Sequence, residues 1–255
     1  MNRFIRNLYS VAGHWATTAC PVIDDRLSYK MLSDIEKQRC SQFAPRSVIP
    51  LANSVFMSKA FTGARYAGAR QMVMLYAGYE TFHIRDSLWY DRIQVFDVNT
   101  SHISADKQAR LTAAGEKPQT HIAEIVCDSM ADCRQLLSVH PAYDVSKTTF
   151  IYMADLPVYI DRKSFKHLLE QLFKIIPPYS SVVFSCTGAE QTDYRWLEKL
   201  LSDTGYLIYE YMTAPQLHTE YLRDFEILNN RHFILPENIS FCVAVKKENR
   251  GYIIV

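Results

Sequence analysis

From residue 70 onward, short runs of β-branched and aromatic residues alternate with stretches of helical periodicity. This rhythm is typical of a mostly parallel sheet with helices on both faces. We predict seven strands, at 71–76, 92–97, 121–126, 148–153, 180–186, 206–212 and 239–246. Helices are predicted between them at 101–114, 130–139, 162–176 and 189–203. A long segment joins the last two strands, which indicates a doubly wound α/β sheet whose final strand is antiparallel.

The first 68 residues contain no convincing strand. They are predicted to form three helices, at about 3–17, 28–41 and 52–67, that cap the sheet. The first has one apolar face at helical spacing, made by Phe4, Leu8, Val11 and Trp15. This face indicates either a helix packed on the domain or a lid over a substrate pocket. We therefore expect an N-terminal helical cap or lid at 1–68 and an α/β core at 69–255, forming one compact unit.

The composition of the 255-residue chain excludes several classes of function. Its 28 basic residues nearly balance its 27 acidic ones, so no strong positive field favours nucleic acid or an anionic membrane. Its six cysteines lack Cys-x-x-Cys pairs and neighbouring histidines at ligand spacing, so we expect no metal site. They are typical of reduced thiols in a cytoplasmic protein. The N-terminal apolar stretch is interrupted by polar residues, and no run is long enough to span a membrane.

Three residues mark the predicted carboxyl ends of the first three strands, where a doubly wound sheet binds its ligands. Gly78 follows the first strand, Asp97 ends the second and Asp128 follows the third. A glycine lets backbone N–H groups approach a ligand, and an acid at the next strand end accepts hydrogen bonds from ribose. The spacing lacks the three glycines of a nicotinamide dinucleotide loop. It therefore favours a nucleoside site, although each acid alone is also compatible with a solvated loop.

The segment GARQMVMLYAGYET at 68–81, with Arg85 behind it, resembles the "GxxQVVxLGAGLDTRxxR" block of the leucine carboxyl methyltransferase-like family. Four further segments resemble later motifs of that family in the same order. They are VFDVN at 95–99 ("VFEVD"), KQARL at 107–111 ("KxxRL"), TFIYMADLPVYI at 149–160 ("TxFVAEGVLMYL") and LLSDTGY at 200–206 ("L…AGF"). The final strand resembles the closing strand of the family, so the resemblance covers most of 65–246.

The resemblance implies a class I methyltransferase-like fold with S-adenosyl-L-methionine as the methyl donor. It places the Gly78 loop at the donor's methionine part, Asp97 at its ribose and Asp128 near its adenine. The complete set of cofactor-binding residues that it implies is Tyr76, Ala77, Gly78, Glu80, Asp97, Val98, Asp128, Ser129, Met153 and Ala154. No arginine clearly matches the one that binds the donor's carboxylate in the family, and Lys59 or Arg65 could replace it.

Five positions depart from the family pattern: Tyr76 replaces a glycine, Glu80 an aspartate, Asn99 an acid, and Ala154-Asp155 a Glu-Gly pair. For Tyr76 two outcomes are open. Its ring can turn into the helical layer and leave the loop usable, which we favour, or it can fill the methionine subsite. The changes cluster at the methionine end, so loss of catalysis, with a role in binding a partner, is the alternative to an active enzyme.

The predicted reaction is O-methylation of a carboxyl or hydroxyl group on a small metabolite or a peptide. Methyl transfer is an in-line displacement that depends on alignment and exclusion of water. A carboxylate acceptor needs no base, whereas a hydroxyl does. His83, Asp155 and Tyr159 are the candidate catalytic residues, with His14 as a further titratable group. The segment at 155–159 also resembles the Asp-Pro-Pro-Tyr loop of enzymes that methylate amino groups of nucleobases, but its prolines are not paired.

Overall fold

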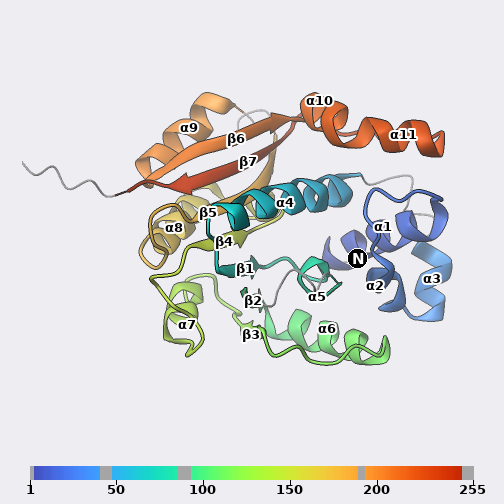
Figure 1. Ribbon diagram of the computed structural model, residues 1–255, viewed down its shortest axis with the longest axis horizontal. Helices are drawn as coiled ribbons and strands as arrows, with labels where there is room; N and C mark the ends of the chain where they lie inside the picture. Colours follow the sequence, from blue (N-terminus) through green and yellow to red (C-terminus); the bar gives the residue numbers. More distant parts are fainter. Residues whose placement is uncertain (1–2, 41–47, 86–92, 189–192, 249–255) are drawn as a thin grey trace, which may run out of the picture.

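The computed structural model of the protein describes residues 3–40, 48–85, 93–188 and 193–248. Seven strands form one sheet in the order β3-β2-β1-β4-β5-β7-β6 (Figure 1). The first five strands run parallel, and β7 is antiparallel to both of its neighbours. The strands are β1 (Gln71–Leu75), β2 (Gln94–Asn99), β3 (Ile122–Val126), β4 (Thr149–Tyr152), β5 (Ser181–Thr187), β6 (Tyr206–Thr213) and β7 (Ile239–Lys246). The predicted doubly wound sheet with an antiparallel last strand is confirmed.

The main helices are α1 (Arg3–Thr17), α2 (Arg26–Lys30), α3 (Asp34–Cys40), α4 (Ile49–Tyr66), α5 (Phe82–Arg85), α6 (Ser101–Ala113), α7 (Cys133–Val139), α8 (Arg162–Phe173) and α9 (Tyr194–Asp203). The helix predicted at 28–41 is wrong, because two short helices take its place. Ser33 and Glu36 cap each other reciprocally and so begin α3 as a separate helix. Residue 41 and the expected helix start at 189–192 lie outside the described residues.

The connection from β6 to β7 is helical throughout its first part. It contains α10 (Ala214–Leu217), the π-helical turn η3 (His218–Leu222) and α11 (Arg223–Asn229). Thr213 and Gln216 form a capping box that starts α10 directly at the end of β6. A turn of 3₁₀-helix, η2 (Leu156–Val158), follows β4.

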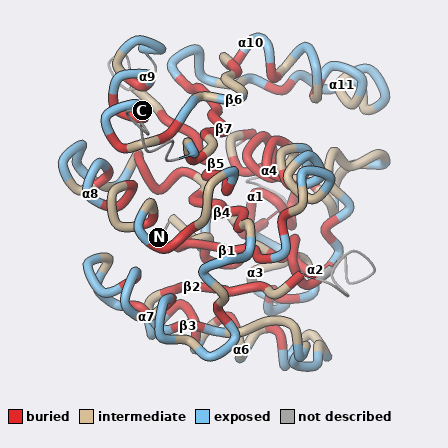
Figure 2. The backbone as a smooth tube through the Cα atoms, turned by 60° about the vertical axis from the view of Figure 1, so that its left-hand side comes forward, coloured by how far each residue is buried: buried red, intermediate tan, exposed pale blue. Residues whose placement is uncertain are grey.

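Alternate residues of the central strands supply two separate cores, as the two-residue period of a strand requires. On β1, Val73 and Leu75 pack toward α7, α8 and α9. Met72 and Met74 pack on the opposite face, toward α4. Figure 2 shows the result, with buried backbone through the middle of the sheet and exposed backbone on the outer helices.

The position of α4 corrects the expectation that all N-terminal helices cap the sheet. Phe56, Met57 and Phe61 of α4 are buried against β1, β4 and β7. This helix therefore covers one face of the sheet, as Figure 1 shows, and removing it would expose the core. Only α1, α2 and α3 form a separate layer, so we now propose that the cap consists of these three helices.

The cap lies at the end of the sheet where β1 leads into α5 (Figure 1). Leu8, Tyr9 and Ala12 of α1 form a third core with α2 and with Tyr79, which follows β1. Among the described residues, no helix is long and apolar enough to cross a membrane, and no group of side chains could hold a metal ion. All six cysteines are free thiols.

Candidate functional site

The loop after β1 begins with Tyr76, whose φ of 52° is in the left-handed region that glycine normally occupies. Its ring is buried in the core beneath the helical layer, beside Cys127 and Cys133. The hydroxyl donates to the carbonyl oxygen of Cys127 at 3.0 Å. Burial raises the pKa of this hydroxyl, so it remains a protonated donor. The ring has therefore turned into the helical layer, the first of the two outcomes considered above.

Gly78 makes the turn of the loop with a φ of 64°. Its N–H donates to Oδ1 of Asn99, the last residue of β2, at 3.0 Å. A methyl group added at Gly78 would lie 2.2 Å from the ring of Phe4 on α1, closer than any real contact. The absence of a side chain at Gly78 thus lets the N-terminal helix lie directly against the loop.

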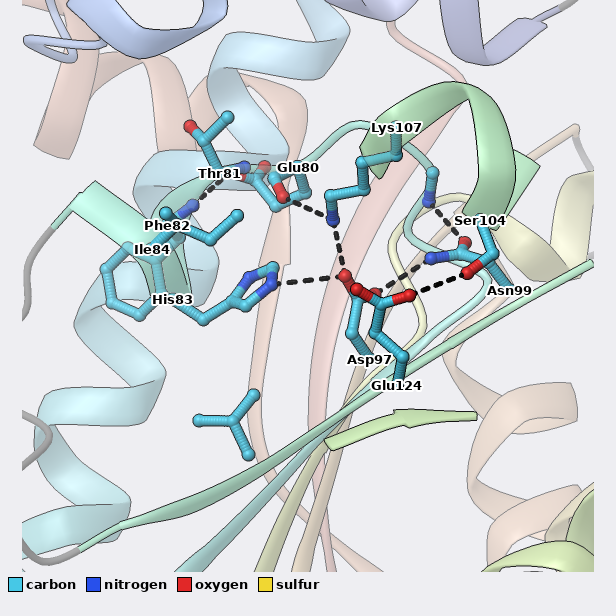
Figure 3. Close-up of polar contacts among 12 residues, drawn as sticks. Glu80, Thr81, Phe82, His83, Ile84, Asp97, Asn99, Ser104, Lys107 and Glu124 are labelled. Atoms are coloured by element: carbon cyan, nitrogen blue, oxygen red, sulfur yellow. Dashed lines mark hydrogen bonds and ion pairs between the residues drawn. The ribbon is translucent and has the colours of Figure 1, made fainter. Parts of the chain in front are cut away.

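Asp97 lies inside β2, two residues before its end, and forms the centre of a buried polar cluster (Figure 3). Its Oδ2 accepts a hydrogen bond from Lys107 of α6 at 2.6 Å and lies 3.2 Å from Nε2 of His83. Its Oδ1 accepts from the side-chain amide of Asn99 at 2.8 Å. Burial disfavours the charged form, but Lys107 and His83 outweigh burial and lower the pKa of Asp97.

These contacts change the interpretation of Asp97. Both of its oxygens are engaged by side chains of the chain itself, and the residue is only 4% exposed. A ribose would have to displace Lys107, which is itself buried. Lys107 also donates to the carbonyl oxygen of Glu80 at 3.0 Å. Asp97 and Lys107 therefore support the loop from β2 and α6, and contact between Asp97 and a ribose stays a prediction that this geometry does not favour.

The expectation that His83 lines the rim is corrected by its burial. The side chain is fully buried on α5, with Nε2 toward Asp97. Burial, followed by the charge of Lys107, lowers the pKa of His83, so its imidazole is neutral. Its Nδ1 has no hydrogen-bond partner among the described residues and lies beside a cavity of about 80 Å³ between α6 and β3. A catalytic role for His83 therefore stays a prediction, which its burial does not favour.

Asp128 and Ser129 are exposed at the carboxyl end of β3, as the sequence predicted for a nucleoside rim. Oδ1 of Asp128 accepts a hydrogen bond from the N–H of Ser101 at 2.7 Å and so caps α6. Val98 is fully buried, so that only its main chain can contribute to a site.

The end of β4 forms the opposite side of the loop. Met153 is fully buried, and Ala154 has a φ of 47°. Asp155 lies 3.7 Å from Nη1 of Arg3, and this guanidinium also stands 4.0 Å from the centre of the Tyr159 ring.

The hydroxyl of Tyr159 accepts a hydrogen bond from Arg6 at 3.5 Å. Burial and then the charge of Asp155 raise the pKa of Tyr159. The two sequence-predicted catalytic residues at the end of β4, Asp155 and Tyr159, are thus brought together, with α1 bound across them.

A cavity of about 40 Å³ lies between α1, α4 and the loop. Glu80 lines it, with one oxygen accepting from Ser54 at 2.7 Å and the other from the N–H groups of Thr81 and Phe82. Asp25 also lines it and accepts hydrogen bonds from Ser28 and Thr81. Asp25 and Ser54 belong to no motif, so the sequence alone does not reveal them. One weak signal was available for Asp25, which precedes Ser28 by three residues, the spacing of an acid that caps a helix.

The other polar residues considered from sequence lie away from this cavity. Lys59 lines a second pocket on the far side of Ser54, and Arg65 lies near the end of α4. His14 is buried in α1, where its Nε2 accepts from the N–H of Val22 at 3.0 Å. Instead, Arg3 lies at the β4 end of the loop, beside Asp155. Its Nη1 is buried and makes no hydrogen bond among the described residues.

Comparison with known proteins now decides the family. A model of the leucine carboxyl methyltransferase family matches residues 2–173. The chain belongs to this family. It is also 26% identical over 232 residues to YktD of Bacillus subtilis (strain 168), named as an inferred S-adenosyl-L-methionine-dependent methyltransferase. The match covers 79% of this chain and 73% of YktD. The chain is therefore an S-adenosylmethionine-dependent methyltransferase, as its sequence motifs predicted.

Solved structures share the fold of this methyltransferase. An O-methyltransferase family protein from Burkholderia thailandensis aligns with a TM-score of 0.54 and 8% identity, over 89% of this chain and 64% of that one. An inferred sarcosine dimethylglycine methyltransferase from Galdieria sulphuraria aligns with a TM-score of 0.51 and 12% identity, over 78% and 86%. At these identities the likeness establishes the class I methyltransferase fold alone.

The methyltransferase fits its donor unevenly along the site. At the carboxyl end of β3, where the resemblance places the nucleoside, Asp128 and Ser129 are exposed. At the methionine end, the cavity of about 40 Å³ is far below the roughly 300–1,000 Å³ of small-molecule sites. Phe4 fills the space beside Gly78. We propose that the donor binds when α1 has moved away from the loop.

Proposed function

We propose that the enzyme transfers the methyl group of S-adenosylmethionine to an oxygen of a small metabolite or a peptide, preferably a carboxylate oxygen. One observation carries the preference for a carboxylate. Both carboxylates that line the cavity, Asp25 and Glu80, are already engaged in hydrogen bonds. Hydrogen bonds from Ser28, Ser54 and Thr81 hold these carboxylates in place, which disfavours either of them as the base for a hydroxyl. A carboxylate acceptor is itself the nucleophile and needs no base.

The remaining candidate bases support the same preference. Burial raises the pKa of Tyr152, which lines the cavity, so its hydroxyl stays protonated. The raised pKa of Tyr159 likewise disfavours the phenolate. Asp155, the nearest remaining carboxylate, pairs with Arg3. A hydroxyl acceptor would need one of these groups to be released first, whereas a carboxylate requires only alignment with the donor's methyl group.

We assign the donor's contacts by the positions of the predicted residues. Asp128 and Ser129 would hold the nucleoside, and the main chain of Tyr76, Ala77 and Gly78 would lie along the methionine part. When bound, the donor supplies an electrophilic methyl group. The protein aligns the acceptor with this group and excludes water once α1 closes on the loop. Arg3, with its buried Nη1, is the candidate partner for the donor's carboxylate.

Calorimetric titration with S-adenosylhomocysteine tests the donor site. Asp128→Ala should weaken binding by about tenfold, since a charge-assisted hydrogen bond contributes about 1.5–3 kcal/mol. Asp132→Ala is the matched control, because Asp132 is an exposed acid close by but beyond the strand end. If the two substitutions change the affinity for S-adenosylhomocysteine equally, the assignment of Asp128 to the donor site is wrong. Failure of the wild type to bind S-adenosylhomocysteine would indicate that catalysis has been lost.

The nature of the product tests the chemistry. The enzyme should be incubated with methyl-labelled S-adenosylmethionine and a panel of carboxylic acids, alcohols and phenols. Label that mild alkali releases as methanol is a methyl ester, whereas a methyl ether resists this treatment. We expect alkali-labile label. Alkali-stable label on oxygen would show that a hydroxyl is the acceptor, and label on nitrogen would refute O-methylation.

A further inference from the structure

A second and much larger pocket adjoins the donor site, with a volume of about 450 Å³. It lies between α4, the segment 22–24 that precedes α2, and the helices η3 and α11. Its volume falls within the roughly 300–1,000 Å³ of sites for small molecules. Most residues that line the pocket come from the N-terminal helices and from the β6–β7 connection, two parts of the chain in which no motif could be identified.

One residue, Ser54, belongs to the lining of both this pocket and the cavity beside the loop. Its hydroxyl donates to Glu80. Phe82 lines the larger pocket, and its N–H donates to the same carboxylate at 3.0 Å. Glu80 therefore lies at the boundary of the two spaces. A ligand in the larger pocket would have its inner end next to the methionine part of the donor.

The charges around the pocket are mainly negative. Three carboxylates line it, those of Asp24, Glu220 and Asp224, against the single ammonium of Lys59. Burial and then the charge of Glu220 raise the pKa of Glu210, which is close to this group. Three carboxylates against one ammonium leave an excess of negative charge around the pocket, so a cation entering it would be favoured.

The apolar walls are aromatic and suit the same kind of ligand. Phe82, Tyr221 and Phe225 line the pocket. The ammonium of Lys59 stands 5.8 Å from the centre of the Tyr221 ring, so the face of this ring already accepts a cation. Aromatic faces beside carboxylates are a chemical environment that recognises organic amines.

We propose that this pocket binds the methyl acceptor and that the acceptor carries a positively charged amine. The inference rests on the proposed function and adds the substrate class: a small amine-bearing carboxylic acid, or a peptide end with a cationic side chain. The amine contacts Glu220 and Asp224 at the outer side of the pocket. The carboxylate to be methylated faces the wall formed by Ser54 and Phe82.

Two probes of similar size and opposite charge test the proposal: phenethylamine and 3-phenylpropanoate. Their affinities should be measured by calorimetry on the full chain saturated with S-adenosylhomocysteine. We expect phenethylamine to bind at least about tenfold more tightly and its affinity to fall as salt is raised. Equal binding of the two probes, binding of neither, or preference for phenylpropanoate would overturn the proposal.

Substitutions locate the binding. Glu220→Gln and Asp224→Asn should each weaken phenethylamine by about threefold and their combination by about tenfold. Glu198→Gln, an exposed acid on α9, is the matched control and should change nothing. Every variant should bind S-adenosylhomocysteine like the wild type. If this binding is lost in the wild type, the proposed function fails, whereas intact binding without amine preference refutes the acceptor class alone.

Discussion

Tyr76 shows how a side chain can occupy a backbone position made for glycine. A left-handed conformation costs a non-glycine residue about 1–2 kcal/mol. Burial of the tyrosine ring and its hydrogen bond to Cys127 outweigh this cost. The ring is held away from the donor side of the loop by the same contacts. The tyrosine ring therefore does not occupy the space on the donor side that we propose for the cofactor.

We predict that Tyr76→Gly destabilises the protein and does not greatly improve donor binding. Loss of a buried aromatic side chain costs about 3–5 kcal/mol, of which relief of the backbone strain returns about 1–2 kcal/mol. The free energy of unfolding should therefore fall by about 2–3 kcal/mol, measured by urea denaturation. The affinity for S-adenosylhomocysteine should stay within about threefold of the wild type.

Tyr76→Phe is the matched control for this substitution. It keeps the ring and leaves the carbonyl oxygen of Cys127 without its donor, which should cost about 1 kcal/mol. A gain of a hundredfold in donor affinity on Tyr76→Gly would contradict the structure, because it would mean that the ring blocks the methionine subsite.

The pair of Asp97 and Lys107 gives a prediction about stability. Each residue is buried and charged, and removing one partner leaves the other uncompensated. Asp97→Ala and Lys107→Met should each lower the free energy of unfolding by about 3–5 kcal/mol. The double variant should lose much less than the sum of the two, which a double-mutant cycle measures.

Independent effects of the two substitutions would contradict the ion pair. A folded Asp97→Ala protein of unchanged stability, with donor binding weakened tenfold, would instead support the sequence-based assignment of Asp97 to the ribose. The two measurements therefore separate support of the loop from contact with the donor. Lys147→Met, which removes an exposed partner of Asp144, is a control expected to cost less than about 1 kcal/mol.

At the scale of elements, α1 determines access to the methionine end of the site. Its first turn binds the end of β4 through Arg3 and Arg6, and Phe4 lies on Gly78. The helix also buries Leu8 and Tyr9. Deleting α1 would therefore expose a core as well as open the site, so a single substitution is the better test of the lid.

We predict that Phe4→Ala strengthens binding of S-adenosylhomocysteine by about three- to tenfold. The donor must displace this ring, and removing it lowers the free energy of opening by about 1 kcal/mol. Calorimetry measures the effect, with Ile5→Ala on the same helix as the control. Weaker or unchanged binding would show that Phe4 does not stand in the way of the donor.

At the scale of the whole molecule, the seven strands and the doubly wound sheet were predictable because buried strands have a strong and local signal. The strand predicted at 92–97 lies two residues before the observed β2 (Gln94–Asn99). The prediction therefore placed Asp97 at the carboxyl end of the strand, a position that Asn99 occupies in the structure. Residues on both faces of the segment QVFDVN are buried, so its sequence shows no alternation of apolar and polar residues that would mark where the strand ends.

Residues of the candidate site were predictable only where they belong to a motif that follows the carboxyl end of a strand. Gly78 and Asp128 follow strands directly, and the structure places both there. His83 was predicted at the rim of the site but is buried against Asp97. The sequence of a short helix does not show whether a histidine in it faces solvent or a buried acid. Asp25 and Ser54 reach the site through packing of α2 and α4, which depends on contacts between distant segments. Such contacts leave no pattern in one sequence.

The stability of the whole protein should fall in mild acid because of His14. Burial, followed by the charge of Arg231, lowers its pKa from 6.5 to about 4. The unfolded chain then binds more protons than the folded one between these values, so stability decreases as pH falls through this window. The contribution reaches about 3 kcal/mol below pH 4. Buried His83 acts in the same direction, since its pKa is also lowered.

We predict that His14→Gln reduces the slope of stability against pH between about 6.5 and 4. The glutamine oxygen can still accept from the N–H of Val22 but does not titrate in this range. Thermal unfolding at several pH values measures the slope, and His167→Gln, at an exposed position of α8, serves as the control. A slope equal to that of the wild type would show that His14 is not the buried neutral group.

Because Phe4 lies so close to Gly78, substitutions at these two positions should be coupled in evolution. A residue with a side chain at position 78 collides with the ring, and a change at position 4 alone leaves a gap over the loop. Related sequences that have lost this glycine should therefore carry a small residue in place of the phenylalanine, or lack the helix that bears it. The paired substitution marks relatives in which the N-terminal helix no longer closes against the loop.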